Sequence, residues 1–169
     1  MPGEKFLQHN GVGGFNEVEA VQAGGAGSAD RIPSLDSNGR LPDTMLPTGI
    51  GADTAMIASS EDLAAGDFVD VYNNAGTANV RKADATTSGK PAVGFVKAAT
   101  VSGASATVFF SGINDSVTGQ TPGAAFLGTT AGAATSTAPS ASNNIVQRIG
   151  IALSATEIAF APMTGVRLV

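Results

Sequence analysis

The segment Ile145-Val146-Gln147-Arg148-Ile149-Gly150-Ile151-Ala152-Leu153 carries the strongest fold signal in the chain. Its large aliphatic residues share one parity, apart from Val146: Ile145, Ile149, Ile151 and Leu153. Successive side chains of a β-strand point to opposite faces, so this alternation predicts a strand with one face in the core. We expect Ile158 and Phe160 to continue the inward face on the next strand.

The same kind of pattern extends through residues 55–169. Short runs of β-forming residues recur at a spacing of about 8–15 residues between turn clusters, which is typical of sandwiches and barrels. The predicted strands are Ala55–Ser59, Asp67–Tyr72, Thr77–Ala83, Ala92–Ala98, Ser105–Ser111, Ala124–Leu127, Asn144–Leu153, Thr156–Ala161 and Val166–Val169. The sequence therefore predicts an all-β fold, a compact antiparallel β-sandwich or barrel.

Two of these strands are apolar on both faces. Phe95 and Val96 are consecutive on one predicted strand, so their side chains point to opposite faces. Val108 and Phe109 are consecutive on another predicted strand and do the same. A second apolar face must be covered either by a second sheet of the same chain or by another subunit. We assign Val96 and Phe109 to a subunit interface, and the sheet-on-sheet core stays open as the alternative.

Residues 1–54 lack this pattern and are predicted to form an extended, mostly irregular N-terminal arm. Glycines interrupt residues 1–29, and only residues 16–23 have the composition of a short helix. Two helical turns are marginal alone, so we expect this acidic, Gly-rich part to be disordered unless a neighbour orders it. Pro33, Pro42 and Pro47 then fix extended backbone in the linker.

The linker is more apolar than a solvated segment needs to be. Its apolar residues are Ile32, Leu35, Leu41, Met45 and Leu46. We expect these five side chains to anchor the arm on a surface.

Composition indicates assembly and argues against some partners. Apolar residues make up 43% of the chain but aromatic residues only 5%, so a self-sufficient core is short of volume and we expect an oligomer, a homotrimer.

Charged residues are 14% and the net charge is −5, which opposes binding to phosphate backbones, so no nucleic acid partner is expected. No apolar run approaches the roughly 20 residues of a membrane span, and the N-terminus does not resemble a signal peptide.

The residues needed for most enzyme chemistry are missing. With no Cys and a single His, His9, the sequence offers no thiolate or imidazole metal site and no Ser-His-Asp arrangement. We therefore predict no catalytic residues, no metal and no cofactor, and expect that the chain is not an enzyme.

Paired carboxylates are the remaining route to catalysis, because glycosidases place two acids across the scissile bond. The candidate pairs are Asp67 with Asp70 and Glu61 with Asp62. Asp67 and Asp70 are three residues apart on one predicted strand and so face opposite sides. We interpret these acids as charges that keep strand edges soluble.

The linker also carries a resemblance. Residues 30–42, Asp30-Arg31-Ile32-Pro33-Ser34-Leu35-Asp36-Ser37-Asn38-Gly39-Arg40-Leu41-Pro42, resemble the KIP-x-LD-x-x-G-(K/R)-LP phrase common in virion structural proteins of tailed bacteriophages. Residues 66–72, 80–85 and 94–99 are similar to small phage head-decoration and accessory proteins.

This resemblance implies a capsid decoration (cement) protein. Such a protein binds the outer surface of the assembled head, with the major capsid protein as partner, and the arm would staple neighbouring capsid subunits. It would be made in the host cytoplasm and reside in the virion. The alternative is a tail fibre or receptor-binding tip that recognises a host glycan, although a single Tyr and no Trp leave few aromatic platforms. A phage carbohydrate hydrolase is a third possibility, disfavoured by the missing acid pair.

Overall fold

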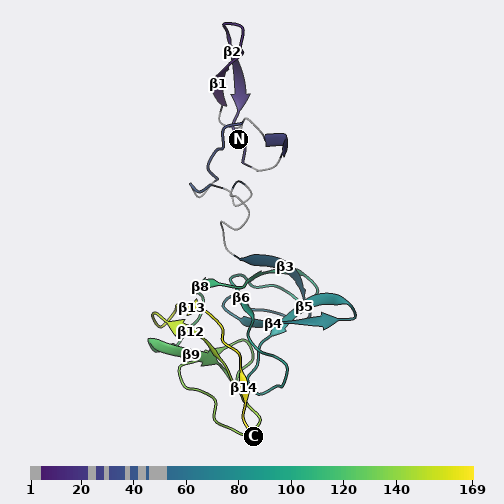
Figure 1. Ribbon diagram of the computed structural model, residues 1–169, viewed down its shortest axis with the longest axis vertical. Coiled ribbons are helices and arrows are strands. Elements are labelled where there is room, and N and C mark those ends of the chain that lie inside the picture. The colour runs from purple at the N-terminus through teal and green to yellow at the C-terminus, as the bar shows by residue number, and fades with distance from the viewer. Residues whose placement is uncertain (1–4, 23–25, 29–30, 37–38, 42–44, 46–52) are drawn as a thin grey trace. The chain divides into compact units, whose positions relative to one another are not determined.

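The computed structural model describes residues 5–22, 26–28, 31–36, 39–41, 45 and 53–169. The chain divides into two compact units, Met1–Gly51 and Ala52–Val169 (Figure 1). The boundary that we expected from the sequence, after residue 54, lies close to this division.

The N-terminal unit contains a β-hairpin. Strands β1 (Lys5–His9) and β2 (Phe15–Glu19) pair antiparallel. The connecting loop is closed by Asn10, whose side-chain oxygen accepts hydrogen bonds from the backbone N–H groups of Val12 (3.0 Å) and Gly14 (2.9 Å). Part of the stretch whose composition would suit a short helix, residues 16–23, therefore lies in β2, where pairing with β1 satisfies the backbone hydrogen bonds.

The rest of the described arm is also more regular than expected. A 3₁₀ turn, η1, covers Ala26–Ser28, and Val21 forms a parallel bridge with Pro33. The Val21 N–H donates to the Ile32 carbonyl (3.0 Å), and the Ser34 N–H donates to the Val21 carbonyl (2.9 Å). No described residue of this unit is fully buried, so its order rests on hydrogen bonds rather than on a core.

The second unit begins with a closed five-stranded barrel. Its strands are β3 (Thr54–Ser59), β4 (Phe68–Asn74), β5 (Thr77–Lys82), β6 (Gly94–Val96) and β7 (Ser105–Phe109). They close in the order β3-β5-β4-β6-β7, and every pair is antiparallel except β3 with β5.

A five-stranded antiparallel sheet follows. It consists of β8 (Gly112–Asn114), β9 (Gly123–Leu127), β10 (Ala134–Thr135), β12 (Arg148–Ala152) and β13 (Ile158–Phe160) in the order β10-β9-β12-β13-β8. Strands β11 (Ile145–Val146) and β14 (Val166–Arg167) form a separate antiparallel pair. The prediction of an all-β domain is confirmed.

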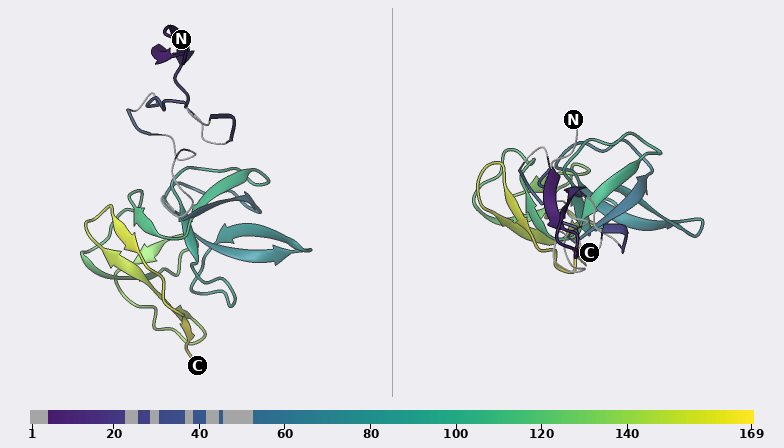
Figure 2. Two further views of the ribbon diagram at one scale, coloured as in Figure 1. Left: turned by 45° about the horizontal axis from the view of Figure 1, so that its top comes forward. Right: turned by 90° about the horizontal axis from the view of Figure 1, so that it is seen from above.

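Two hydrophobic cores stabilise this unit. The barrel core contains Leu63, Val69, Val80, Val96, Ala106 and Val108. The interlayer core lies between barrel and sheet, where Phe68 and Phe95 of the barrel meet Leu127, Ile149, Ile158 and Phe160 of the sheet. Figure 2 shows the teal strands of the barrel beside the green and yellow strands of the sheet.

Aromatic rings connect the two layers. The ring of Phe160 lies 5.6 Å from Phe68 and 5.5 Å from Phe95, measured between centroids. Phe95 in turn stacks on Phe109 at 5.4 Å. Such pairs add about 0.5–1.5 kcal/mol beyond area burial, so a few phenylalanines do much of the filling in this Ala-rich core.

The long strand expected over Asn144–Leu153 is split and bulged. Gln147 separates β11 from β12, and the pairing of β12 with β9 shifts register between Arg148 and Gly150. The shift reverses the side-chain alternation, so Ile149 is buried whereas Ile151 (46% exposed) and Leu153 (51% exposed) face outward. Our expectation that all four aliphatic residues share the inward face is therefore wrong for Ile151 and Leu153, although Ile158 and Phe160 are buried as expected.

Candidate ligand groove and interface residues

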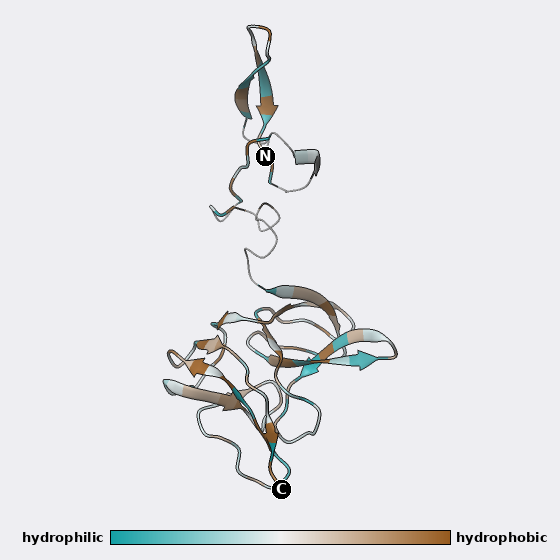
Figure 3. Cartoon of the chain, viewed as in Figure 1, coloured by the Kyte–Doolittle hydropathy of each residue, from teal (hydrophilic) through white to brown (hydrophobic). Residues whose placement is uncertain are grey.

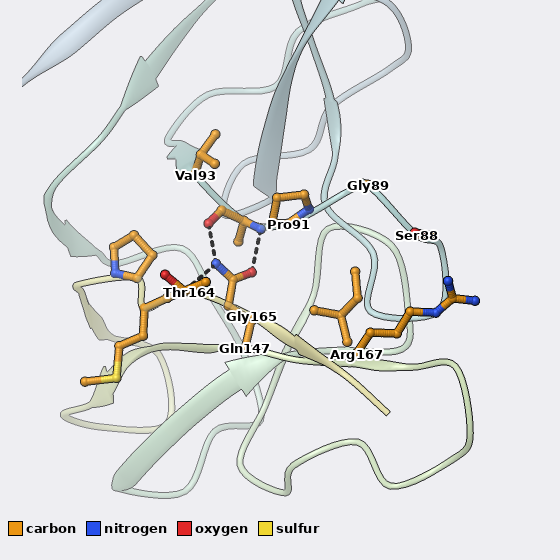
Figure 4. Close-up of a pocket in the computed structure, with 12 residues that line it drawn as sticks. Ser88, Gly89, Pro91, Val93, Gln147, Thr164, Gly165 and Arg167 are labelled. Carbon is orange, nitrogen blue, oxygen red and sulfur yellow. Dashed lines mark hydrogen bonds between the residues drawn. The ribbon is translucent and has the colours of Figure 1, made fainter. Parts of the chain in front are cut away.

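An open groove of about 540 Å³ lies where the loop before β6 meets β11 and the segment that leads into β14. The lining residues are Ser88, Gly89, Pro91, Ala92, Val93, Ile145, Gln147, Pro162, Met163, Thr164, Gly165 and Arg167 (Figure 4). This volume is in the range of small-molecule sites, which are mostly apolar with a few placed polar groups.

Gly165 sets how closely the two sides of the groove approach. A side-chain Cβ at this position would lie 2.7 Å from Cγ2 of Ile145 and 3.2 Å from Cβ of Gln147. Only a residue without a side chain lets the 162–165 segment lie against β11, so Gly165 shapes the groove floor.

Gln147 joins two of the segments that line the groove by hydrogen bonds. Its amide Nε2 donates to the carbonyls of Ala92 (2.8 Å) and Met163 (3.0 Å), and its Oε1 accepts from the Ala92 N–H (2.8 Å). The side chain is buried, with 3% of the residue exposed. The Gln147 amide thus joins the loop before β6 to the segment before β14 by hydrogen bonds of the kind that strand pairing provides elsewhere. The dashed lines in Figure 4 show these bonds.

The groove lining is mainly apolar and carries few charged groups. The lining residues, all in the described part of the chain, include no His, Asp or Glu that could act as a base for Ser88 or Thr164. The only charge is that of Arg167, whose guanidinium donates to Oδ1 of Asn143 (2.9 Å). A ligand here would be apolar with, at most, an anionic group near Arg167.

The acids considered as catalytic pairs have structural partners. Asp67 is 3.1 Å from Nζ of Lys82, and Asp70 is 2.8 Å from Nε of Arg81. Burial raises the pKa of the Asp70 carboxyl, and the hydrogen bond and charge of Arg81 oppose that rise. These interactions hold the β4–β5 pair together and give Asp67 and Asp70 separate basic partners.

The second proposed acid pair is also structural. Glu61 accepts a hydrogen bond from the Lys82 N–H (2.9 Å), and Asp62 accepts one from the Ser102 N–H (2.8 Å). His9 lies on β1, where its Nδ1 accepts from the Gly11 N–H (3.1 Å). Among the described residues, no three His, Asp or Glu side chains cluster in a way that could hold a metal ion.

The predicted arm anchors are largely exposed where the structure describes them. Ile32 is 51% exposed, Leu35 57% and Leu41 39%, whereas Met45 is partly buried. Leu46 lies outside the described residues. Ile32, Leu35 and Leu41 thus present exposed apolar side chains within one short segment.

The two residues assigned to a subunit interface are instead part of the chain's own packing. Val96 is 1% exposed in the barrel core, so a partner subunit cannot reach it, and that assignment is wrong. Phe109 is partly buried against the interlayer core. The second apolar face of these strands is covered by the barrel interior and by the sheet, the alternative that the sequence left open.

Sequence reasoning missed the groove. Two signals were present in the sequence. Gln147 has the parity of the predicted inward face, so it is a polar residue expected to be buried and to need hydrogen-bond partners. Pro162 has no N–H group to donate to a sheet, which indicates a break in strand pairing. The partners themselves, Ala92 and Met163, are distant in sequence and could not be predicted.

Comparisons with protein families, with curated proteins and with solved structures found no match to this chain. Over the residues that the structure covers, no helix has the length and apolar character needed to cross a membrane.

Proposed function

We propose that this chain is a non-enzymatic structural protein of a tailed bacteriophage particle that decorates the outer surface of the head. The N-terminal arm attaches it to the major capsid protein, and the β domain forms the outward body. The phage setting rests on the resemblance in the linker; the attachment role rests on the arm's exposed apolar side chains.

The single observation that carries the attachment role is the exposure of Ile32, Leu35 and Leu41 in a unit whose described residues include none that is fully buried. Burying a Leu or Ile side chain completely is worth about 1.5–3 kcal/mol. These three residues are already partly covered, so each would contribute on the order of 1 kcal/mol on a capsid surface. That is enough to favour attachment when several arms act together on one lattice.

The acidic charge of the arm supports the same role. Residues 1–60 hold seven acids and three bases, an excess of four, whereas residues 61–169 hold seven acids and six bases, an excess of one. A basic strip on the capsid would therefore attract the arm in preference to the β domain.

The experiment is to replace two anchors, Leu35→Ser and Leu41→Ser, and to measure copies per phage head after mixing with undecorated particles. We expect the double variant to bind at least about tenfold more weakly, since about 1.4 kcal/mol corresponds to a factor of ten. Val101→Ser is the matched control, because Val101 is 68% exposed but lies in the β domain. Unchanged occupancy of the double variant would overturn the arm as the attachment element.

A tail fibre or receptor-binding tip is the second candidate function, and the groove favours it. An apolar groove with Arg167 at its edge would suit a ligand, and a receptor-binding tip uses its β domain for contact with the host. Under this alternative, obstructing the groove from its exposed rim with Ser88→Trp would abolish adsorption to host cells, whereas the arm variants would still adsorb.

A further inference from the structure

The outer face of the five-stranded sheet is apolar where an exposed antiparallel sheet is usually polar. Four residues from four neighbouring strands stand side by side on this face. The pairing registers place Ala124 beside Ile151, Ile151 beside Ala159, and Ala159 beside Ile113. We call this set the apolar row: Ala124, Ile151, Ala159 and Ile113.

The apolar row is open to solvent. Ile113 and Ile151 are each 46% exposed, while the inward neighbours Ala152 and Ile158 are buried. Figure 3 shows hydrophobic colour along β9, β12 and β13. A contiguous apolar face of this kind commonly marks a contact with another protein.

Opposite charges flank the apolar row along the strand direction. Arg148 stands at one end, beside Phe126, and Glu157 stands at the other, beside Leu153. They are separated by about four residue steps, roughly 13 Å at 3.3 Å per residue. In the described part of the chain neither forms an ion pair: Arg148 donates to the Gly150 carbonyl (3.4 Å), and Glu157 accepts from the Ser154 hydroxyl (3.3 Å).

We propose that this face binds the same face of a second copy of the chain, about a two-fold axis that runs along the apolar row. Rotation about this axis reverses the strand direction, so Arg148 of each copy lies over Leu153 of the other and one strand, about 4.8 Å, from its Glu157. Residues of the row meet their own counterparts, and Ile151 faces the partner's Ile151. A two-fold contact is self-complementary by construction, which matches a face that carries one cation, one anion and an apolar centre.

The size of the face sets the strength of the pair. The five strands hold 18 residues, and at about 4.8 Å spacing and about 3.3 Å per residue they give an area on the order of 300 Å² per copy. The pair would bury about 600 Å², which is below the range of stable specific interfaces. We therefore expect weak association in solution, with a dissociation constant in the high micromolar range or above, which many copies on one particle would reinforce.

The absence of cysteine from the chain permits a direct test by disulfide trapping. Ile151→Cys in the full chain should form a covalent dimer under mild oxidation, because the two introduced thiols would face each other across the axis. Val101→Cys, which is similarly exposed but lies on a barrel loop, is the control for random collision. We expect at least tenfold faster crosslinking for Ile151→Cys, and equal rates for the two variants would overturn the proposal.

Charge reversal tests the direction of the axis. In the Ile151→Cys background, Arg148→Glu alone and Glu157→Arg alone should each slow crosslinking several-fold, and the two together should restore it. Failure of the double reversal to restore the rate, with circular dichroism showing a folded chain, would contradict the two-fold arrangement. Sedimentation equilibrium of the natural chain should fit monomer and dimer, and a monomer–trimer equilibrium would overturn the pair in favour of the expected homotrimer.

Discussion

Position 66 requires glycine, both for its backbone conformation and for its close packing against Ser116. Its φ is +90°, and a Cβ there would overlap the carbonyl group of Ser116. Its own carbonyl accepts a hydrogen bond from Nδ2 of the buried Asn114 (2.9 Å), so the segment cannot move away without losing that bond. Gly76 has nearly the same φ, +92°, but nothing lies within 4 Å of its would-be Cβ.

This pair of glycines separates backbone strain from steric overlap. Gly76→Ala should cost about 1 kcal/mol, the cost of left-handed backbone alone. Gly66→Ala adds the clash and the weakened Asn114 bond, so we expect a loss of about 3 kcal/mol or more. Urea unfolding of both variants measures the difference, and equal midpoints would contradict the close packing against Ser116.

Asp84 makes stability depend on pH. Burial would raise the pKa of its carboxyl, but hydrogen bonds from the Thr86 N–H, the Thr86 hydroxyl and the Thr87 hydroxyl, each 2.8 Å long, together lower it below the ordinary value of 3.8. A lowered folded-state pKa contributes stability above pH 3.8 that is lost as the pH falls through the folded-state value.

Asp84→Asn should therefore reduce stability at neutral pH and flatten the loss of stability below pH 4. Thermal unfolding from pH 7 down to the acid limit, compared between the natural chain and the variant, measures this. Parallel curves at all pH values would show that Asp84 has the same pKa in the folded and unfolded states.

At the scale of elements, Gln147 decides where one strand ends and the next begins. Leucine in its place would fill similar volume but leave the N–H and C=O of Ala92 and the C=O of Met163 without their partners. Unsatisfied buried groups cost about 1–3 kcal/mol each, so Gln147→Leu should destabilise the domain by on the order of 3 kcal/mol. Calorimetry measures this, with Gln120→Leu as control.

Gln120 is a suitable control because its amide is less well satisfied. Its Nε2 donates to the carbonyl of Thr118 (3.0 Å), but its Oε1 is buried without a partner among the described residues. Its replacement should cost clearly less than that of Gln147. A larger loss for Gln120→Leu would contradict the role given to Gln147.

Most strands of the domain could be predicted from local pattern, because alternation and turn residues are properties of short segments. The missed strands, β8 (Gly112–Asn114) and β10 (Ala134–Thr135), are two or three residues long and exist only because a neighbour pairs with them. The bulge at Ile149 and Gly150 was unpredictable for the same reason, and it moved Ile151 to the outside. The arm hairpin depends on pairing between Lys5–His9 and Phe15–Glu19, which a helix-forming composition concealed.

The two units differ in burial: both hydrophobic cores found among the described residues lie in the second unit. Residues 52–169 hold every buried hydrophobic side chain among the described residues, so this unit should fold independently of the arm. We expect a fragment of residues 52–169 to unfold within about 2 °C of the full chain, since no described residue of the arm is fully buried. Differential scanning calorimetry measures this, and a much lower transition would show that the arm packs on the domain.

The central claim is that the arm fixes this chain to a phage head. Cryo-electron microscopy of the intact particle tests it most directly, by giving the copy number and position of the chain. The account predicts many copies on the head lattice, with the segment from Ile32 to Leu41 in contact with the major capsid protein. A few copies at the end of the tail, with the β domain pointing outward, would contradict it and make the chain a fibre or tip.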